Sequence, residues 1–290
     1  MACRSCPASA ATPEATYAAL VADGDVFTEE GVRFKRTFLD LGDPVMCAYQ
    51  MWEDWADEIG VSKDESHRAA AEGFKALEYY HARLRSRARA ILETLKREKR
   101  LGVVLLARPY HADPGINHGI LDQIQAQGFP ILTVDSLPLD ADVLDPLFAV
   151  EAAGVEAAGG RGSCRAADIP ARNIDDVWKH SFSENSSRKI WAAKFAARHP
   201  NLAALELSSF KCGHDAAISW TIERILECSG TPFFCFRDID ENKPSASLKM
   251  RVDTIVYFLR RYMEELSQSQ STGSSGRSWF PRAFRGSTES

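Results

Sequence analysis

The chain has 290 residues, of which 45% are hydrophobic and 26% are charged, and its formal net charge at pH 7 is −5. This composition is typical of a globular protein and excludes a disordered or fibrous one, and the length allows about two domains. The negative charge gives no global attraction for nucleic acid, and no apolar run approaches the ~20 residues of a membrane span. Because the N-terminus lacks a basic segment followed by an apolar one, we expect a cytoplasmic protein that binds neither nucleic acid nor a membrane.

The seven cysteines are scattered along the chain. An odd number in a chain without an export signal argues against a disulfide framework and for reduced thiols, some of which could bind metal. Cys3 and Cys6 form a lone Cys-x-x-Cys pair with no second pair at zinc-ribbon spacing, which is a weak indication of metal. Cys228 and Cys235 fall inside a predicted helix and a predicted strand, where core packing is the expected role.

Helical patterns dominate residues 17–100, after an N-terminus (residues 1–16) that is rich in Ala, Pro, Ser and Thr and is expected to be loose. From Ser62 to Arg100 no Pro interrupts the chain, and apolar residues recur at the spacing of an amphipathic helix. Basic residues cover the other face of this helix, and two explanations are open. The face could simply be solvated, since cations near the C-terminal end of a helix are stabilised by its dipole. It could also bind phosphate or an acidic partner. The basic residues are Arg83, Arg85, Arg87, Arg89, Lys96, Arg97, Lys99 and Arg100.

From Gly102 onward, short apolar strands alternate with helices. The predicted strands are Val103–Ala107, Ile131–Val134, Leu202–Leu207 and Phe233–Phe236, and the predicted helices are Asn117–Gln127, Asn185–Arg198, Asp215–Cys228 and Ser245–Leu266. Unbroken apolar runs joined by helical crossovers are typical of parallel strands that are buried on both faces. We therefore predict an α/β fold for residues 101–266: an open, doubly wound parallel sheet of the flavodoxin or Rossmann kind. A Gly-rich and Ala-rich insertion (residues 151–172) is expected to be flexible, and a Ser-rich tail (residues 267–290) to be disordered.

Three loops that follow predicted strands are dense in side chains that titrate or bind ligands. They cover residues 108–118, 208–215 and 237–244. Because an open parallel sheet binds its ligands at the carboxyl ends of its strands, we expect these loops to share one edge. Each loop also has a structural explanation: Asn117 and Asp215 could be helix N-caps, and Pro114–Gly115 could form a turn.

Cys212 is the strongest single candidate in these loops. It precedes Gly213 at a predicted helix N-terminus, between Lys211 and His214, in surroundings that favour the thiolate, the form that binds metals and attacks carbon. The alternative role is that of a small buried hydrophobe. Neither Gly-x-Gly-x-x-Gly nor Gly-x-x-x-x-Gly-Lys-Ser/Thr occurs, so we do not expect the chain alone to hydrolyse ATP.

Several long motifs, in order, resemble the C-terminal part of the large activase-related proteins of the 2-hydroxyacyl-CoA dehydratase system. They are Ala107–Ile120, Asp176–Trp178 with Ser183–Ser186, Ser208–Asp215, and Asp238–Pro244. The region from Tyr17 to Arg100 resembles the same family more loosely. The resemblance implies a dehydratase-subunit-like α/β domain within an ATP-dependent, low-potential electron-transfer system that acts on CoA thioesters.

In that family an actin-like ATPase half, which carries an iron–sulfur cluster, is joined to the dehydratase-like region. No segment here resembles the ATPase half, so the resemblance implies a fragment or split-gene product, with ATP on the missing half and that half or a dehydratase subunit as partner. It implies Cys212 as a ligand of a [4Fe–4S] cluster, which needs about four ligands. Either the other ligands come from other segments or chains, or this region keeps the fold without the cluster. In this hypothesis His111, His118 and His214 are catalytic, as ligands or proton carriers, and Arg108, Lys211 and Asn117 contact the cofactor.

Two other hypotheses stay open. The first is a non-catalytic scaffolding module that docks the activase half or a partner subunit through the basic helix and the last helix. The second is a mononuclear metal hydrolase built from His111, Asp113, His118 and His214.

Overall fold

The computed structural model describes residues 7–148, 174–179, 183–208, 212–237, 239 and 245–272. The chain divides into two compact units, Met1–Arg83 with Phe182–Glu184, and Leu84–Ser181 with Asn185–Ser290. The division falls inside one helix, α4, which covers Lys63–Glu98. No helix in these described ranges combines the length and the apolar character that crossing a membrane requires.

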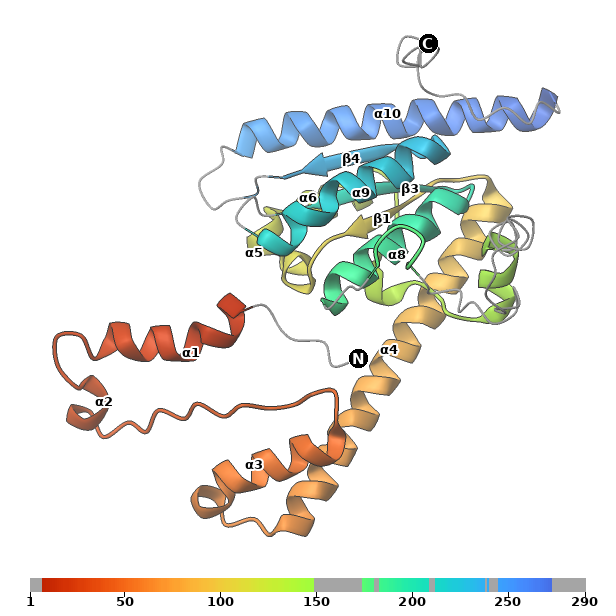
Figure 1. Ribbon diagram of the computed structural model, residues 1–290. Helices are drawn as coiled ribbons and strands as arrows, with labels where there is room; N and C mark the ends of the chain where they lie inside the picture. The colour runs from red at the N-terminus through yellow and green to blue at the C-terminus, as the bar shows by residue number, and fades with distance from the viewer. Residues whose placement is uncertain are drawn as a thin grey trace. The chain divides into compact units, whose positions relative to one another are not determined.

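The first unit is helical. It contains α1 (Pro7–Leu20), α2 (Val26–Glu29), α3 (Pro44–Ile59) and the beginning of α4 (Figure 1). Asp43 caps the N-terminus of α3, because its Oδ1 accepts hydrogen bonds from the backbone N–H groups of Val45 and Met46 at 2.9 and 3.0 Å. Ser66 of α4 donates its hydroxyl to the carbonyl of Ala48 at 2.9 Å, which joins α4 to α3. Helix α1 occupies most of the segment that we expected to be loose.

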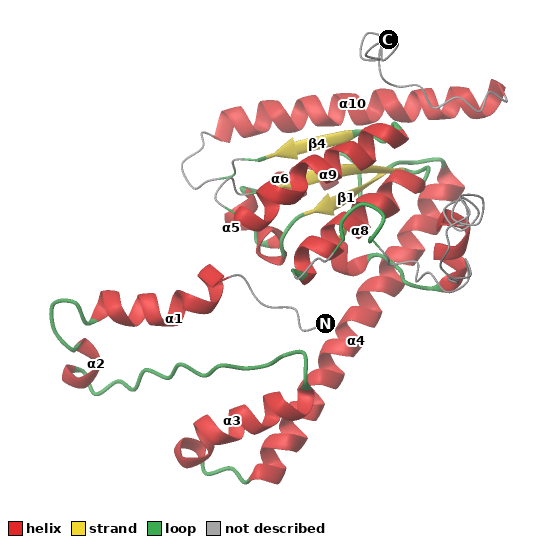
Figure 2. Ribbon diagram, in the orientation of Figure 1, coloured by secondary structure: helices red, strands yellow, loops and turns green. Residues whose placement is uncertain are grey.

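The second unit is built around four parallel strands. They are β1 (Gly102–Leu106), β2 (Ile131–Thr133), β3 (Leu202–Leu207) and β4 (Phe233–Phe236), in the order β2-β1-β3-β4. Figure 2 shows strands of this sheet in yellow, among them β1 and β4. All three pairings are parallel, with Val104 opposite Leu132 on one side and Ala204 on the other. The predicted α/β fold with a parallel sheet is confirmed.

Helices cover both faces of this sheet. Val104 and Leu106 pack with α4, with α8 (Glu184–Arg198) and with α9 (Gly213–Ser229). Val103 and Leu105 pack on the other face with α6 (Ile120–Ala126) and α10 (Ser245–Thr272). Successive side chains of a strand point to opposite faces, so an unbroken apolar run supplies both cores.

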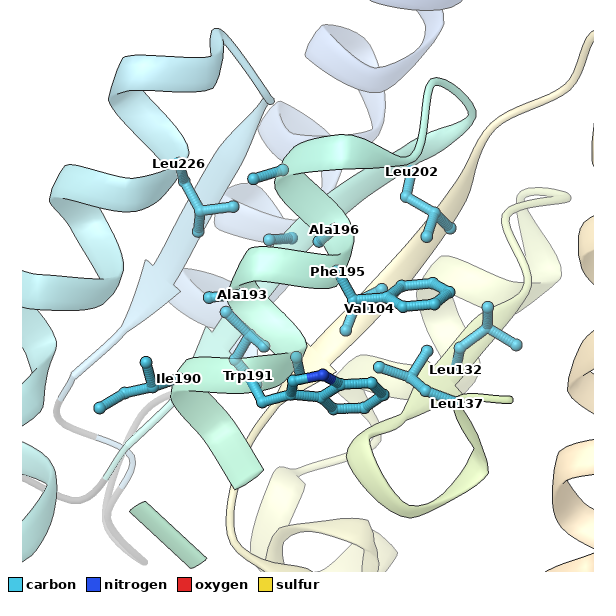
Figure 3. Close-up of a cluster of buried hydrophobic side chains, with 14 of the residues drawn as sticks. Val104, Leu132, Leu137, Ile190, Trp191, Ala193, Phe195, Ala196, Leu202 and Leu226 are labelled. Atoms are coloured by element: carbon cyan, nitrogen blue, oxygen red, sulfur yellow. The ribbon is translucent and has the colours of Figure 1, made fainter. Parts of the chain in front are cut away.

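Helix α8 contributes the largest side chains to the first of these cores. Figure 3 shows Trp191 and Phe195 of α8 beside Val104, Leu132 and Leu137. Trp191 is 3% exposed and Phe195 is fully buried. Because α8 is covered on nearly all sides, any charged group that it carries inward must find its counter-charge within the protein.

The observed elements differ from the predicted ones at several ends. The helix predicted at Asn117–Gln127 is divided into α5 (Pro114–Asn117) and α6, because His118 and Gly119 have left-handed φ angles of 54° and 70°. Helix α10 runs to Thr272, six residues past the predicted end at Leu266. The insertion at residues 151–172 and the tail from residue 273 lie outside the described residues. The prediction that Cys228 packs in the core is wrong, because Cys228 is exposed. Cys235 is half-buried.

Candidate functional site at the carboxyl edge of the sheet

The carboxyl ends of β1 and β3 form the topological switch point of the sheet. The chain leaves β1 through a short helical turn, Pro109–Ala112, and then through α5 and α6 toward one face. It leaves β3 toward α9 on the opposite face. Open α/β sheets bind their ligands in the crevice where neighbouring connections diverge in this way. Two of the three loops that the sequence predicted to share an edge therefore begin on either side of this switch point, and most of the third, residues 237–244, lies outside the described residues.

A buried ion pair between Arg108 and Asp215 links the two loops. Arg108 follows β1, and Asp215 lies in the first turn of α9. The Nε group of Arg108 donates to Oδ1 of Asp215 at 2.9 Å, and Nη2 lies 2.9 Å from the same oxygen. Arg108 also donates from Nη2 to the hydroxyl of Ser186 at 3.3 Å, and Ser208 donates to Oδ2 of Asp215 at 3.3 Å. Since Arg108 is 7% exposed and Asp215 fully buried, the pair is shielded from water and tightly coupled.

A second buried pair, Lys189 of α8 and Glu206 of β3, adjoins the first. Lys189 Nζ lies 2.8 Å from Glu206 Oε1 and 3.4 Å from Asp215 Oδ1. Both side chains are fully buried, and within the described residues Lys189 Nζ and both carboxylate oxygens of Glu206 have no aligned hydrogen-bond partner. The contact is thus a close ion pair without hydrogen-bond geometry. Arg108, Lys189, Glu206 and Asp215 together balance two positive charges with two negative ones, and we call them the buried ion network.

His111 lies beside this network as a buried, neutral imidazole. Its Nδ1 accepts a hydrogen bond from the backbone N–H of Arg108 at 3.2 Å, so the ring proton of the neutral form lies on Nε2. The pKa of His111 is lowered to about 4, chiefly by burial; the Asp215 carboxylate opposes this shift, and the Lys189 and Arg108 cations add to it. A proton-carrying role for His111 near pH 7 would have to overcome this low pKa.

The other predicted site residues in the first loop shape its backbone. The Asn117 amide donates to the carbonyl of His111 at 3.0 Å and accepts from the N–H of Gly119 at 2.9 Å, so Asn117 holds the backbone of the loop together and does not take the N-cap role that the sequence left open. Asp113 caps α5 by accepting from the N–H of Gly115 at 2.8 Å. His118 is half-buried in the left-handed turn that follows.

In the second loop, Cys212 is the N-cap residue of α9 and is half-buried, and His214 is half-buried in its first turn. Asp215 does not take the N-cap role that the sequence left open, because its carboxylate turns inward to Arg108. Lys211 lies outside the described residues. The structure thus brings Arg108 and His111 together with Asp215, and it places Cys212 three residues before Asp215 at the same strand end.

The described residues do not fit a complete iron–sulfur cluster. In the described ranges, no three His, Cys, Asp or Glu side chains form a group that could hold a metal ion. Of the four described thiols, Cys212 is the one in a loop at the carboxyl edge: Cys47 belongs to the first unit, Cys228 lies at the far end of α9, and Cys235 lies within strand β4. A [4Fe–4S] cluster needs about four ligands. The same finding removes the metal site of the hydrolase hypothesis, because all four of its residues are described.

The sequence analysis missed Lys189 and Glu206. A signal was present in each case: Glu206 is an acid within the otherwise apolar strand Leu202–Leu207, and Lys189 adjoins the apolar run of α8. A charged residue in such a place is almost never fully buried unless it is paired. Lys189 and Glu206 could therefore have been predicted to form a buried ion pair with each other.

Comparison with known proteins gives one family. Residues 2–137 match the family model of the CoA enzyme activase uncharacterised domain. The match covers the helical region, β1, the loop with Arg108 and His111, and β2, and it ends before β3. No curated protein and no solved structure matches the chain. The resemblance to CoA enzyme activase-related proteins is confirmed over residues 2–137, which are similar to the CoA enzyme activase uncharacterised domain.

Proposed function

We propose that the chain is a docking module of a CoA enzyme activase assembly, a system that uses ATP to drive low-potential electron transfer to CoA thioesters. The actin-like ATPase half of that assembly is the partner, and ATP binds there. The match of residues 2–137 to the CoA enzyme activase uncharacterised domain supports the assembly. The lack of a phosphate-binding glycine motif in the sequence supports the placement of ATP on the partner.

The observation that carries the docking role is the construction of the carboxyl edge. The buried ion network fixes the loop after β1 against α9, and this loop carries two large apolar side chains on its surface, Tyr110 (47% exposed) and Ile116 (42% exposed). Fixed, exposed apolar groups beside a polar rim are typical of a protein-binding surface, because groups that are already ordered lose little conformational entropy on binding.

A binding experiment with surface variants tests the docking role. The actin-like ATPase half, produced separately, is titrated against the full chain and against Tyr110→Asp and Ile116→Asp. We expect each substitution to weaken binding at least tenfold. The matched control is Met250→Asp on α10, where Met250 is 71% exposed, and it should bind as the unaltered chain does. Equal binding by all four proteins, or no binding at all, contradicts the proposal.

A second candidate role is the supply of one thiolate, from Cys212, to a [4Fe–4S] cluster that the partner completes. The position of Cys212 favours it: the thiol is half-buried at the N-terminus of the 17-residue helix α9, where the helix dipole stabilises negative charge. Bound there, a cluster would supply one-electron redox chemistry. The role of this chain would be to hold the thiolate at a fixed strand end.

Anaerobic reconstitution of the complex with iron and sulfide separates the two roles. Absorption and paramagnetic resonance spectra should show a cluster that Cys212→Ala alters and that the control Cys228→Ala leaves unchanged. A cluster indifferent to Cys212→Ala, or spectra without any cluster, removes the ligand role. Binding of the partner by Cys212→Ala is measured in the same preparations, so the docking role stands or falls separately.

A further inference from the structure

A groove of about 490 Å³ lies at the amino edge of the sheet, at the opposite end of the strands from the buried ion network. One wall is the second half of helix α4, which contributes Arg87, Ala90 and Ile91, and the opposite wall includes Pro130 in the turn that leads into β2. Arg87 and Ala90 are exposed, and Ile91 is half-buried. Arg87 has no hydrogen bond or ion pair with any described residue. The groove is therefore open and largely apolar, with a guanidinium at its beginning.

The helix that forms this wall is strongly basic. Between residues 84 and 100 the sequence carries seven Lys and Arg residues against two Glu residues, although the whole chain has a net charge of −5. Both glutamates are already bonded within this stretch, Glu93 to Arg89 and Glu98 to Arg97 and Arg100. The surplus of positive charge favours an acidic occupant for the groove.

Helix α3 of the first unit has the opposite character. Its 16 residues include four acids and no Lys or Arg. Two of these acids, Glu53 and Asp57, are exposed. The large apolar side chains of Val45 (66%) and Ile59 (63%) are exposed as well. Helix α3 is thus an acidic helix with an uncovered apolar surface.

The first unit has a very small core of its own. Among its described apolar side chains, Cys47, Ala48 and Ala70 are the buried ones. They lie where α3 meets the beginning of α4, beside the hydrogen bond from Ser66 to the carbonyl of Ala48. An apolar surface that so small a core leaves exposed is typical of a surface that another protein covers.

The side chains of α3 and α4 match in their order as well as in their charge. On α3 a ridge of residues at four-residue intervals changes from apolar to acidic: Val45, Tyr49, Glu53 and Asp57. On α4 a ridge with the same spacing changes from basic to apolar: Arg83, Arg87 and Ile91. Ridges of this spacing pack into each other's grooves when two helices cross at about 50°. If the two helices are antiparallel, Glu53 meets Arg87 while Tyr49 meets Ile91.

We propose that α3 of a second copy of this chain occupies the groove, antiparallel to α4, and that the contact forms twice in a two-fold dimer. Two copies of α3 repel each other, and so do two basic ends of α4, so the favourable pairing is α3 of one copy with α4 of the other. Stable interfaces bury about 800 Å² per partner, and in a two-fold dimer each copy contributes one helix and one groove to that area. The dimer contact shares no residue with the docking surface at the carboxyl edge, so the two proposals fail independently.

Sedimentation velocity of the full chain at a series of concentrations tests the dimer. We expect a monomer–dimer equilibrium. Glu53→Lys and Arg87→Glu should each raise the dissociation constant of the dimer about tenfold or more, because each places like charges opposite one another twice. The double variant with both exchanges restores opposite charges in both contacts and keeps the net charge of the chain. Its dissociation constant should return to within about threefold of that of the unaltered chain.

Matched controls place the same charge changes on other helices. Asp253→Lys lies on α10 and Arg224→Glu on α9, and both residues are exposed. Each control should change the dissociation constant less than about twofold, because exposed charges away from an interface are screened by salt. Circular dichroism of every variant checks that the fold is kept.

Four results overturn the proposal. The first is a chain that stays monomeric at every concentration tested. The second is a dimer that Arg87→Glu weakens and Glu53→Lys does not, because another acidic segment would then occupy the groove. The third is a double variant as weak as the single ones, because Glu53 and Arg87 would then not face each other. The fourth is an assembly larger than a dimer, because a reciprocal two-fold contact closes at two copies.

Discussion

The exchange Asp215→Asn removes the charge that joins the two loops of the carboxyl edge. Asp215 is fully buried, and its carboxylate contacts Arg108 at 2.9 Å and Lys189 at 3.4 Å. The amide of Asn keeps the size of the side chain and one acceptor oxygen. It leaves two buried cations facing a single anion, Glu206.

Breaking a buried ion pair by removing one partner typically costs about 3–5 kcal/mol, because the remaining charge stays buried. Lys189 keeps Glu206, and the amide oxygen still accepts from Arg108, so we expect the lower end, about 3 kcal/mol. With a urea m-value of about 2 kcal/mol per molar, the unfolding midpoint should fall by about 1.5 M.

Urea unfolding followed by far-ultraviolet circular dichroism measures this change. The control is Asp142→Asn, which breaks an exposed pair with Arg89 and should leave the midpoint nearly unchanged. The double exchange Arg108→Met with Asp215→Leu should recover much of the loss, since the apolar pair removes one cation with one anion and leaves Lys189 balanced by Glu206. If Asp215→Asn shifts the midpoint no more than Asp142→Asn does, the network does not hold the edge together.

Three further predictions concern single residues. The pKa of His111 is about 4 in the folded chain and near 6.5 in the unfolded chain, so between these pH values the unfolded chain binds one proton more. The free energy of unfolding should therefore fall by about 2–3 kcal/mol as the pH drops from 7 to 4. Urea titrations at both pH values should show a smaller fall for His111→Gln. An unchanged pH slope in that variant would contradict the assignment. Cys228 is exposed and burial raises the pKa of the Cys235 thiol, so a thiol reagent should modify Cys228 much faster, as followed by mass spectrometry of the peptides; equal rates would refute it. Gly119→Ala should cost about 1 kcal/mol in thermal unfolding, because Gly119 has a φ of 70°; an unchanged midpoint would show that the turn relaxes freely.

The strands could be predicted from the sequence because an unbroken apolar run between turn residues has few other solutions. The ends of the helices were harder to predict. Residues 267–272 are Ser, Gln and Thr, whose composition is typical of a tail, yet they continue α10. The break between α5 and α6 depends on the left-handed conformation of His118, which a helical propensity does not reveal.

The candidate site was predicted as a place but not as a set of contacts. That the loops after β1 and β3 share an edge follows from topology, and Arg108, His111 and Asn117 were named on that basis. That Asp215 would turn inward to Arg108, instead of capping α9, depends on a partner 107 residues away. Local sequence patterns favour the cap, because they contain no information about distant charges.

The docking role is tested most directly by hydrogen–deuterium exchange of the full chain, with and without the actin-like ATPase half. We predict slower exchange on binding in residues 107–119 and in the first turns of α9. Protection confined to other segments, such as α3 with its exposed Val45 and Ile59, or no protection at all, would contradict the claim that the carboxyl edge of the sheet receives the partner.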